Sequence, residues 1–202
     1  RFKGRKPATG YRVTPFGREL TRQAGIGSGY RFFLILHCES FHNKPKTLSM
    51  ETTRTFDLLE RYRALPAKED ALCFKQNGSW IKYSSQDYID NSYNFCYGLY
   101  EMGFRKGDKI ITISHNRPEW NFADMAMAML GVVHVPVFIS LSAPEYEYII
   151  NHSGARMVIV SDSKLLKTVS PAITAAVNSP VYYTFDAVKD VPNWHEIAEK
   201  GK

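Results

Sequence analysis

Residues 108–162 constrain the fold of this chain most, because strand-like and helix-like segments alternate there with a signal at most boundaries. Three short, nearly continuous apolar runs are typical of strands buried on both faces, and they occupy residues 110–114, 132–138 and 156–162. Between them lie two segments with helix signals, a first-turn proline at Pro118 and a closing glycine at Gly154. This alternation predicts an α/β fold, a mostly parallel sheet with right-handed crossovers and helices on both faces.

The segments before this region predict a short helix and a hairpin. Thr55 is in position to cap a helix over residues 56–65, and Asp57 suits its positively polarised first turn. Asn77-Gly78, between two alternating apolar segments, is the strongest hairpin signal in the chain.

A long helix is predicted to follow the hairpin. Ser84 and Asp87 resemble a capping box at its start, and Gly103 suits a left-handed end. We expect one face of this helix to be apolar, and that face holds Ile89, Tyr93, Cys96, Leu99 and Tyr100.

The later segments add details of the same fold. Pro136 within its predicted strand implies an edge, a bulge or a strand end. Ser163 is expected to cap a helix that Pro171 interrupts, and a last strand precedes a short polar helix around Trp194. We expect the ring of Trp120 to be turned into the core against the sheet.

The formal net charge of +6 is concentrated at the amino-terminal end of the chain. Residues 1–49 hold 10 lysines and arginines against 2 acids, whereas residues 50–202 hold 16 against 18. The first 49 residues also lack a sustained period of 2 or 3.6, so we expect a basic leader that is disordered or not native. The folded domain is expected to span residues 50–202, with the native start at or near Met50.

The leader contains a glycine-rich segment, residues 25–29, that looks like a phosphate-binding loop. Such a loop needs a strand before it and a helix after it. Here a polar segment precedes it and a strand-like apolar run, Phe32–Leu36, follows. We therefore assign no phosphate-binding role to this segment.

The cysteine pattern bears on the compartment of the protein. The three cysteines, at Cys38, Cys73 and Cys96, have no spacing typical of disulfide frameworks or zinc sites. No secretory signal is evident either, so we expect a reducing, cytoplasmic location. The longest apolar stretch, Met125–Leu141, contains glycine, histidine and proline, and we interpret it as a helix that runs into a buried strand.

Three histidines could in principle carry chemistry. His115, His134 and His152 have no acid, histidine or cysteine at ligand spacing along the sequence, so structural roles are favoured. His115 is the strongest functional candidate of the three, because it follows a predicted parallel strand at the end where α/β proteins usually bind ligands.

The acids and methionines have simpler explanations. Turn or first-turn helix chemistry accounts for Asp108, Glu119 and Asp124, and a solvated helix face accounts for Glu145 and Glu147. The methionines at positions 125, 127 and 129 fit core packing better than a ligand set. We assign no catalytic, cofactor-binding or metal-binding residue.

The order and spacing of three segments resemble the adenylate-forming acyl-CoA synthetases, the AMP-forming fatty-acid–CoA ligases. The segments are NRPEW at Asn116–Trp120, GVVHVPV at Gly131–Val137 and the run over Asn151–Asp162. DLLERY at residues 57–62 and the later WIKYS are more similar to long-chain fatty-acid ligases of bacterial type than to peptide-synthetase adenylation domains. Ile139 stands where many relatives have a second proline, which affects the local loop alone.

The resemblance implies that the chain is the amino-terminal part of a large adenylate-forming domain. In this family a fatty-acid carboxylate attacks the α-phosphate of Mg·ATP, which gives an acyl-adenylate and pyrophosphate, and the coenzyme A thiol then displaces AMP. The complete enzyme is thereby implied to use ATP, Mg²⁺ and coenzyme A, with a fatty acid as substrate. Peripheral association with a membrane is a further expectation.

The family's phosphate loop, of the kind YTSGTTGxPK, does not occur in these 202 residues. No functional residue of the family can therefore be transferred to a position of this chain. We expect the fragment alone to be inactive.

Two other hypotheses remain open. The chain could be a non-catalytic α/β module that binds a partner; DNA after Lys202 that continues to a phosphate loop would support the ligase, and a stop codon with retained expression would support the module. A nucleic-acid binder rests on the leader alone, and deleting residues 1–49 would then abolish salt-sensitive binding. Because acids outnumber basic residues after the leader, we expect no specific nucleic-acid partner.

We predict that residues 1–49 are dispensable for the fold. Ordering them would cost about 1–2 kcal/mol per residue in backbone entropy, and the segment has few apolar side chains to offset that cost. Limited trypsin digestion should cut rapidly in the leader and leave a stable product that begins between Lys46 and Arg54. Protection of the leader's arginines comparable with that of Arg117 would contradict this prediction.

Overall fold

The computed structural model describes residues 53–76 and 78–202. The predictions for residues 1–49, including the segment at 25–29, the run at Phe32–Leu36 and the start at Met50, lie outside these described residues. Asn77 of the hairpin turn also lies outside them.

A four-stranded parallel sheet organises the described residues. Its strands are β3 (Lys109–Ile113), β4 (Val133–Val137), β5 (Met157–Val160) and β6 (Val181–Thr184), and they lie in the order β4-β3-β5-β6. Every strand pair in this sheet is parallel. The predicted α/β fold with a mostly parallel sheet is confirmed.

Edge strand β4 shows how the sheet tolerates a proline. The backbone N–H of Val133 donates to Asp108 O on the side of β3. Because successive residues of a strand point their backbone groups to opposite sides, Pro136 directs its missing N–H toward the open edge. The proline therefore removes no bond from the sheet, and of the edge, bulge or strand end that the sequence allows, the structure has the edge.

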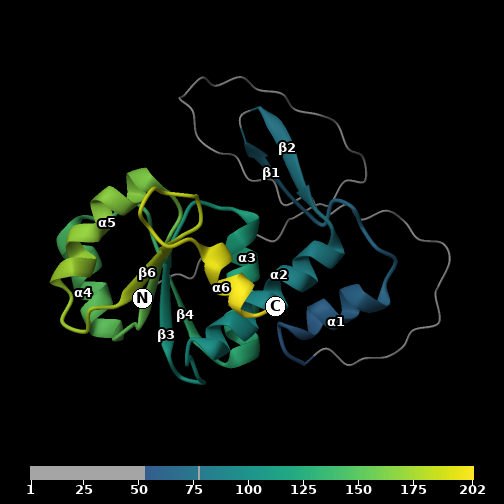
Figure 1. Cartoon of the computed structure of the whole chain (residues 1–202), viewed down its shortest axis with the longest axis horizontal. Helices are drawn as coiled ribbons and strands as arrows, with labels where there is room; N and C mark the ends of the chain where they lie inside the picture. Colours follow the sequence, from purple (N-terminus) through teal and green to yellow (C-terminus); the bar gives the residue numbers. More distant parts are fainter. Residues whose placement is uncertain (1–52, 77) are drawn as a thin grey trace, which may run out of the picture.

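Helices cover both faces of the sheet (Figure 1). They are α1 (Asp57–Ala64), α2 (Ser85–Glu101), α3 (Pro118–Leu130), α4 (Ala143–Ser153), α5 (Ser163–Ala175) and α6 (Trp194–Lys200). Figure 1 shows α4 and α5 on one side of the sheet and α2, α3 and α6 on the other. None of the helices in the described part of the chain combines the length and apolar character needed to cross a membrane.

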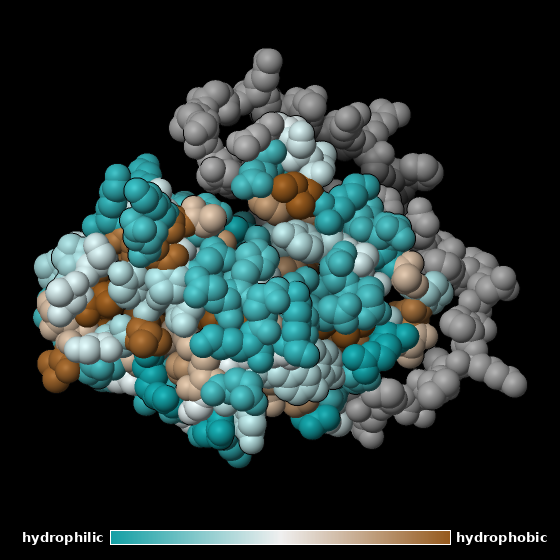
Figure 2. All heavy atoms as spheres, in the orientation of Figure 1, coloured by the Kyte–Doolittle hydropathy of each residue, from teal (hydrophilic) through white to brown (hydrophobic). Residues whose placement is uncertain are grey.

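Each face of the sheet has its own apolar core. Ile110, Met157 and Ile159 pack toward α2, α3 and α6, whereas the alternate side chains of β3 and β5 pack toward α4 and α5. The view in Figure 2 shows a mostly hydrophilic surface with apolar side chains in small separate patches. The apolar side chains of β3 and β5 are therefore buried in the two cores, whereas Val133 and Phe138 at the edge strand β4 remain exposed.

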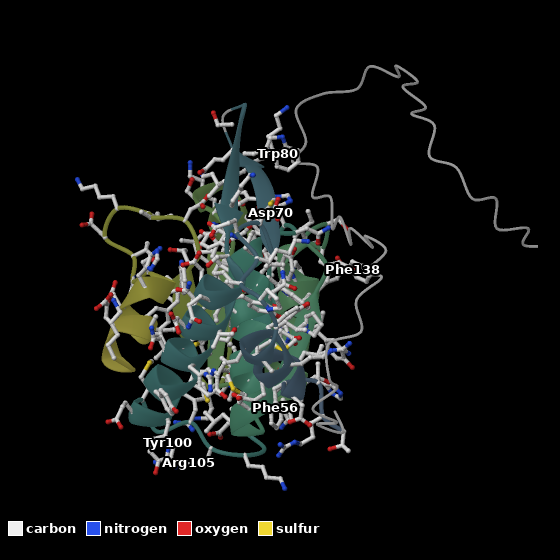
Figure 3. The ribbon with its side chains drawn as sticks, turned by 90° about the vertical axis from the view of Figure 1, so that its right-hand side faces the viewer. Phe56, Asp70, Trp80, Tyr100, Arg105 and Phe138 are labelled. Carbon is white, nitrogen blue, oxygen red and sulfur yellow. The ribbon has the colours of Figure 1, made fainter. Side chains whose placement is uncertain are left out.

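A hairpin of β1 (Leu72–Gln76) and β2 (Ser79–Tyr83) projects from the helical layer. Figure 3 shows Trp80 on this hairpin, at the end of the molecule opposite Arg105, which precedes β3. The amino ends of the parallel strands thus lie far from the hairpin, and the carboxyl ends lie on its side.

Helix α2 begins and ends as the sequence predicts. The Ser84 side chain accepts from the Asp87 N–H and the Asp87 carboxylate accepts from the Ser84 N–H, so the capping box is confirmed. Gly103 follows the helix with a φ of 82°, in the left-handed region. The predicted apolar face is displaced by part of a turn, because Phe95 is fully buried while Tyr100 is 49% exposed.

The structure corrects two predicted helix caps. Thr55 makes no cap for α1; the Asp57 carboxylate instead accepts hydrogen bonds from the N–H groups of Thr53 and Arg54. The hydrogen bond from the Arg54 guanidinium is the main reason that the pKa of Asp57 falls to about 2. At α5 the cap is Asp162 rather than Ser163, because the Asp162 carboxylate reaches the N–H groups of the next turn.

The predicted interruption at Pro171 is wrong. Helix α5 runs through this proline without a break. A proline removes one backbone bond, at a typical cost of about 3 kcal/mol. Leu166 and Val169 before it and Ile173 after it are all buried in the same core, and we infer that this burial holds the two halves in one helix.

Helix α6 is more deeply packed than the predicted short polar helix. Trp194 is 2% exposed and its ring lies 6.1 Å from that of Phe95 on α2. Gly98 of α2 lies directly against the backbone of Ile197 on α6, where a methyl group would run into the Ile197 carbonyl oxygen. The absence of a side chain at Gly98 therefore sets the distance between these two helices.

We predict that Gly98→Ala destabilises the chain. Alanine favours a helix by about 1 kcal/mol over glycine, but overpacking typically costs about 1–3 kcal/mol and more against rigid backbone. Urea denaturation should show a net loss, with reduced protection of the α6 amides in hydrogen exchange. The control is Glu101→Ala on the exposed side of α2, with an expected change within about 0.5 kcal/mol. An unchanged unfolding midpoint for Gly98→Ala would show that α6 can move away freely.

Candidate functional site

The chain connections single out the carboxyl ends of β3 and β5. The crossover from β3 runs through α3 to β4, and the crossover from β4 returns through α4 on the other face to β5, on the far side of β3. The connections that leave β3 and β5 therefore run in opposite directions. In open α/β sheets this switch point, at the carboxyl ends of the strands, is where ligands usually bind.

Arg117 is the hub of the polar groups at this edge. Its Nε and Nη2 donate to the two carboxylate oxygens of Glu119, at 2.8 and 3.0 Å. Its Nη1 donates to Ser161 O at 3.1 Å and to Asp186 Oδ1 at 2.9 Å. One side chain thus joins the start of α3 to the ends of β5 and β6.

The charge of Arg117 is held in place by its partners. Burial by itself lowers the pKa of Arg117, but the hydrogen bonds and charges of Glu119 and Asp186 outweigh burial and raise the pKa. The side chains of Arg117 and Glu119 are only 11% and 7% exposed. Since nearly all donors of the guanidinium are already used, Arg117 acts here as a structural clamp.

His115 and Asp162 form a second pair at the same edge. His115 Nε2 lies 3.7 Å from Asp162 Oδ2, with the His115 side chain 44% exposed. Burial raises the pKa of Asp162, but hydrogen bonds from the Leu165 N–H and the Ser161 hydroxyl, with the charge of His115, lower it overall. Asp162 is therefore an ionised helix cap beside a histidine at the exposed rim of the switch point.

A third polar cluster lies behind this edge, between β3, β4 and α3. His134 Nε2 lies 2.7 Å from Thr112 Oγ1, and His134 Nδ1 lies 2.7 Å from Asp124 Oδ1. The Nε1 of Trp120 donates to the same Thr112 oxygen at 3.1 Å. The interpretation of Trp120 is correct in its contact with the sheet and wrong in its full burial, because the side chain is half-buried.

The order of groups in this cluster is that of a hydroxyl, imidazole and carboxylate catalytic triad. Two observations exclude Thr112 as a nucleophile in this conformation. Its side chain lies in the core, with the residue 1% exposed, and its oxygen already accepts from Trp120. The cluster therefore has no reactive atom that faces a substrate.

The remaining residues considered from the sequence have packing or capping roles. Asp108 accepts from the Arg105 N–H and pairs with Arg156, while Glu145 completes a capping box with Ser142. The ring of His152 stacks on Tyr148 at 5.6 Å. The methionines at positions 125, 127 and 129 belong to the core on the α3 side, as core packing predicts.

Sequence reasoning missed the carboxylate partners of two histidines. His115 meets Asp162 and His134 meets Asp124, although neither pair has a ligand-like spacing in the sequence. A usable signal did exist for the first pair. The carboxyl ends of neighbouring parallel strands share one edge, so the residues that follow the two predicted strands, His115 and Asp162, were a pair to consider.

The described part of the chain shows no preformed metal site. Within residues 53–76 and 78–202, no three or more histidine, cysteine, aspartate or glutamate side chains come together in a geometry that could hold a metal ion. At the switch point, protein partners use nearly all donors of Arg117, and Asp162 caps a helix. No cofactor-binding role is therefore assigned to these residues.

Comparison with known proteins places the chain in a large family. The family model described as "AMP-binding enzyme" matches residues 60–200. A fatty acyl-CoA synthetase A of Dictyostelium discoideum is 30% identical over 135 residues, which cover 62% of this chain and 20% of that protein. A 4-hydroxybutyrate–CoA ligase of Metallosphaera sedula is 36% identical over 84 residues, which cover 42% of this chain and 15% of that protein.

Solved structures support the fold. A benzoate CoA ligase from Burkholderia xenovorans matches with a TM-score of 0.60 and 19% identity, over 72% of this chain and 28% of that one. The chain thus spans about a fifth of the length of the first of these sequence relatives and under a third of this structural relative. At this identity the structural match shows the fold alone.

We predict that Arg117→Ala lowers the free energy of unfolding by about 3–5 kcal/mol, because it leaves the buried Glu119 carboxylate without its partner. The double variant Arg117→Met with Glu119→Leu removes both charges and should recover most of the loss in urea denaturation. Arg63→Ala is the matched control, since the Arg63–Glu60 pair is exposed and should contribute less than about 1 kcal/mol. A double variant no more stable than Arg117→Ala would refute the role of the unpaired carboxylate.

Proposed function

Because this chain belongs to the family of AMP-binding enzymes, we propose that it forms the amino-terminal part of an AMP-forming fatty-acid–CoA ligase. The observation that carries this proposal is the family match over residues 60–200, joined by a relative named as a fatty acyl-CoA synthetase. The complete enzyme would activate a carboxylic acid with ATP as an acyl-adenylate and transfer the acyl group to coenzyme A. Mg²⁺ would accompany the ATP.

A long-chain fatty acid is the substrate that we propose. The name of the Dictyostelium relative, a fatty acyl-CoA synthetase, supports a fatty acid, and the resemblance of residues 57–62 and 80–84 to long-chain ligases supports a long one. The Metallosphaera relative, named for 4-hydroxybutyrate, makes a short acid the competing substrate. A cytoplasmic location and peripheral contact with a membrane are parts of the proposal.

The test begins with the transcript beyond codon 202. We expect an open frame that encodes a Ser/Thr/Gly-rich phosphate loop. The polypeptide encoded by that frame should form acyl-CoA from ATP, coenzyme A and a carboxylic acid, in a panel from acetate to palmitate. Preference for the long acids would support the proposed substrate, and preference for short acids would replace it while leaving the reaction in place.

The alternative is a non-catalytic α/β module that binds a partner. One observation favours this alternative. The polar side chains at the switch point bind one another, as in the contacts of Arg117 with Glu119 and Asp186 and of His115 with Asp162. A stop codon directly after Lys202, with stable expression of the 202-residue chain, would favour this module over the ligase.

We predict that the 202-residue polypeptide alone forms no acyl-adenylate, because it contains no phosphate loop to position the triphosphate. ATP–pyrophosphate exchange should stay at background with every acid of the panel. The longer polypeptide serves as the positive control. Substrate-dependent exchange by the purified 202-residue chain would contradict the prediction.

A further inference from the structure

The cluster behind the switch point is a continuous chain of hydrogen bonds. It runs from Trp120 Nε1 to Thr112 Oγ1, then to His134 Nε2, and from His134 Nδ1 to Asp124 Oδ1. Thr112, within this chain, is buried, with 1% of the residue exposed. Asp124, at one end of the chain, is accessible to solvent, with 33% of its side chain exposed. A titratable ring thus lies between the core and solvent.

The partners fix the direction of every bond in this chain. An ionised carboxylate only accepts, so the Nδ1 beside Asp124 must carry a hydrogen. In a neutral imidazole Nε2 is then a bare acceptor, and the Thr112 hydroxyl donates to it. The hydroxyl oxygen keeps its lone pairs for the Trp120 N–H, so all four groups are satisfied at once.

Protonation of the ring breaks this order. A proton taken from solvent by Nε2 turns that atom from an acceptor into a donor. His134 and Trp120 then both direct N–H groups at the single Thr112 oxygen, and the Thr112 hydroxyl hydrogen loses its acceptor. The two lone pairs of the oxygen can accept both N–H groups, but the buried hydroxyl hydrogen is left without an acceptor, which is costly. This cost is relieved when the hydroxyl turns and the half-buried Trp120 ring withdraws its N–H, so the contact between Trp120 and Thr112 weakens.

We propose that His134 is a proton-operated lock on helix α3, which fastens Trp120 to strand β3 when the ring is neutral and releases it when the ring is charged. The lock acts near the switch point, because Trp120 lies in the first turn of α3 beside Glu119, the carboxylate that holds Arg117. Release therefore loosens the segment that carries the clamp. The inference is independent of the proposed function.

Asp124 and Thr112, the two groups in contact with the nitrogens of the His134 ring, act in opposite directions on its protonation. Asp124 of α3 favours the charged ring, and Thr112 of β3, with Trp120, favours the neutral one. From α2, Tyr88 stays neutral in this range, since burial, followed by the nearby Tyr62 and Asp124, raises its pKa. Arg117, the N-cap residue of α3, and Glu119 in its first turn offset each other as a pair.

The experiment is an NMR titration of the intact 202-residue chain labelled with ¹⁵N in histidine and tryptophan. At about pH 8, where histidine is normally neutral, the His134 nitrogen shifts should show hydrogen on Nδ1 and a bare Nε2. Between about pH 8 and 5, the interval in which histidines titrate, the Trp120 indole N–H resonance should shift with the same midpoint as the His134 ring. This correlated shift is the expected result.

Two variants separate the lock from other effects of acid. His134→Gln keeps a polar side chain without a titratable ring, so the Trp120 indole shift should become flat with pH. His195→Gln is the matched control, because His195 lies 4.1 Å from the ring of Trp194 and has no bond to this cluster among the described residues. In that control the Trp120 shift should remain.

Several outcomes would overturn the proposal. They are a hydrogen on Nε2 at the alkaline end, a His134 ring that does not titrate in this interval, a Trp120 resonance that ignores the ring, and a transition in which all resonances unfold together. The wild-type titration decides by itself if the glutamine variant at His134 fails to fold.

Discussion

The structure depends on one constraint: strands β3 and β5 are apolar on both faces. Ile111 and Ile113 of β3 and Val158 and Val160 of β5 are fully buried against α4 and α5, while the alternate side chains are buried against the other helical layer. Two neighbouring strands of this kind cannot face water on either side. Helices must cover both faces, so the crossovers have to pass on both sides of the sheet, and the switch point between β3 and β5 follows.

The polar groups at the carboxyl ends of the strands bind other groups of the same chain. Arg117 collects the carboxylates of Glu119 and Asp186 with the carbonyl of Ser161, and Asp162 caps α5 while it lies beside His115. Such contacts stabilise the edge and leave few donors for a ligand. This arrangement suits a segment that supports a catalytic site supplied by other parts of an AMP-binding enzyme, which is the role that we propose.

Helix α3 connects this edge to the interior cluster. Its first turn carries Glu119, which holds the arginine, and Trp120, which holds the sheet through Thr112. Further along, Asp124 holds His134. The same helix is therefore held by a buried ion pair at its start and by a hydrogen-bonded histidine farther along, which is where we propose a proton-dependent response.

The sequence alone determined the features that local signals control. Alternating strand and helix patterns predicted the parallel sheet, and Ser84 and Asp87 predicted the capping box. Pro136 left an edge, a bulge or a strand end open, and the structure has it on an edge strand. The NRPEW and GVVHVPV segments led to the family that the comparisons show. Each of these signals lies within a few residues, where backbone geometry and side-chain type act directly.

Tertiary structure decided which distant residues meet and which of two neighbouring residues caps a helix. Arg117 and Asp186 meet because β3 and β6 lie on either side of β5. The spacing of residues along the sequence does not determine this strand order. Asp162 displaced Ser163 as the cap of α5, since the carboxylate beside the strand end reaches the free N–H groups. Pro171 stayed inside a helix because burial on both of its sides outweighs one lost bond. Long-range contacts settle such choices, and they exist only once the sheet has formed.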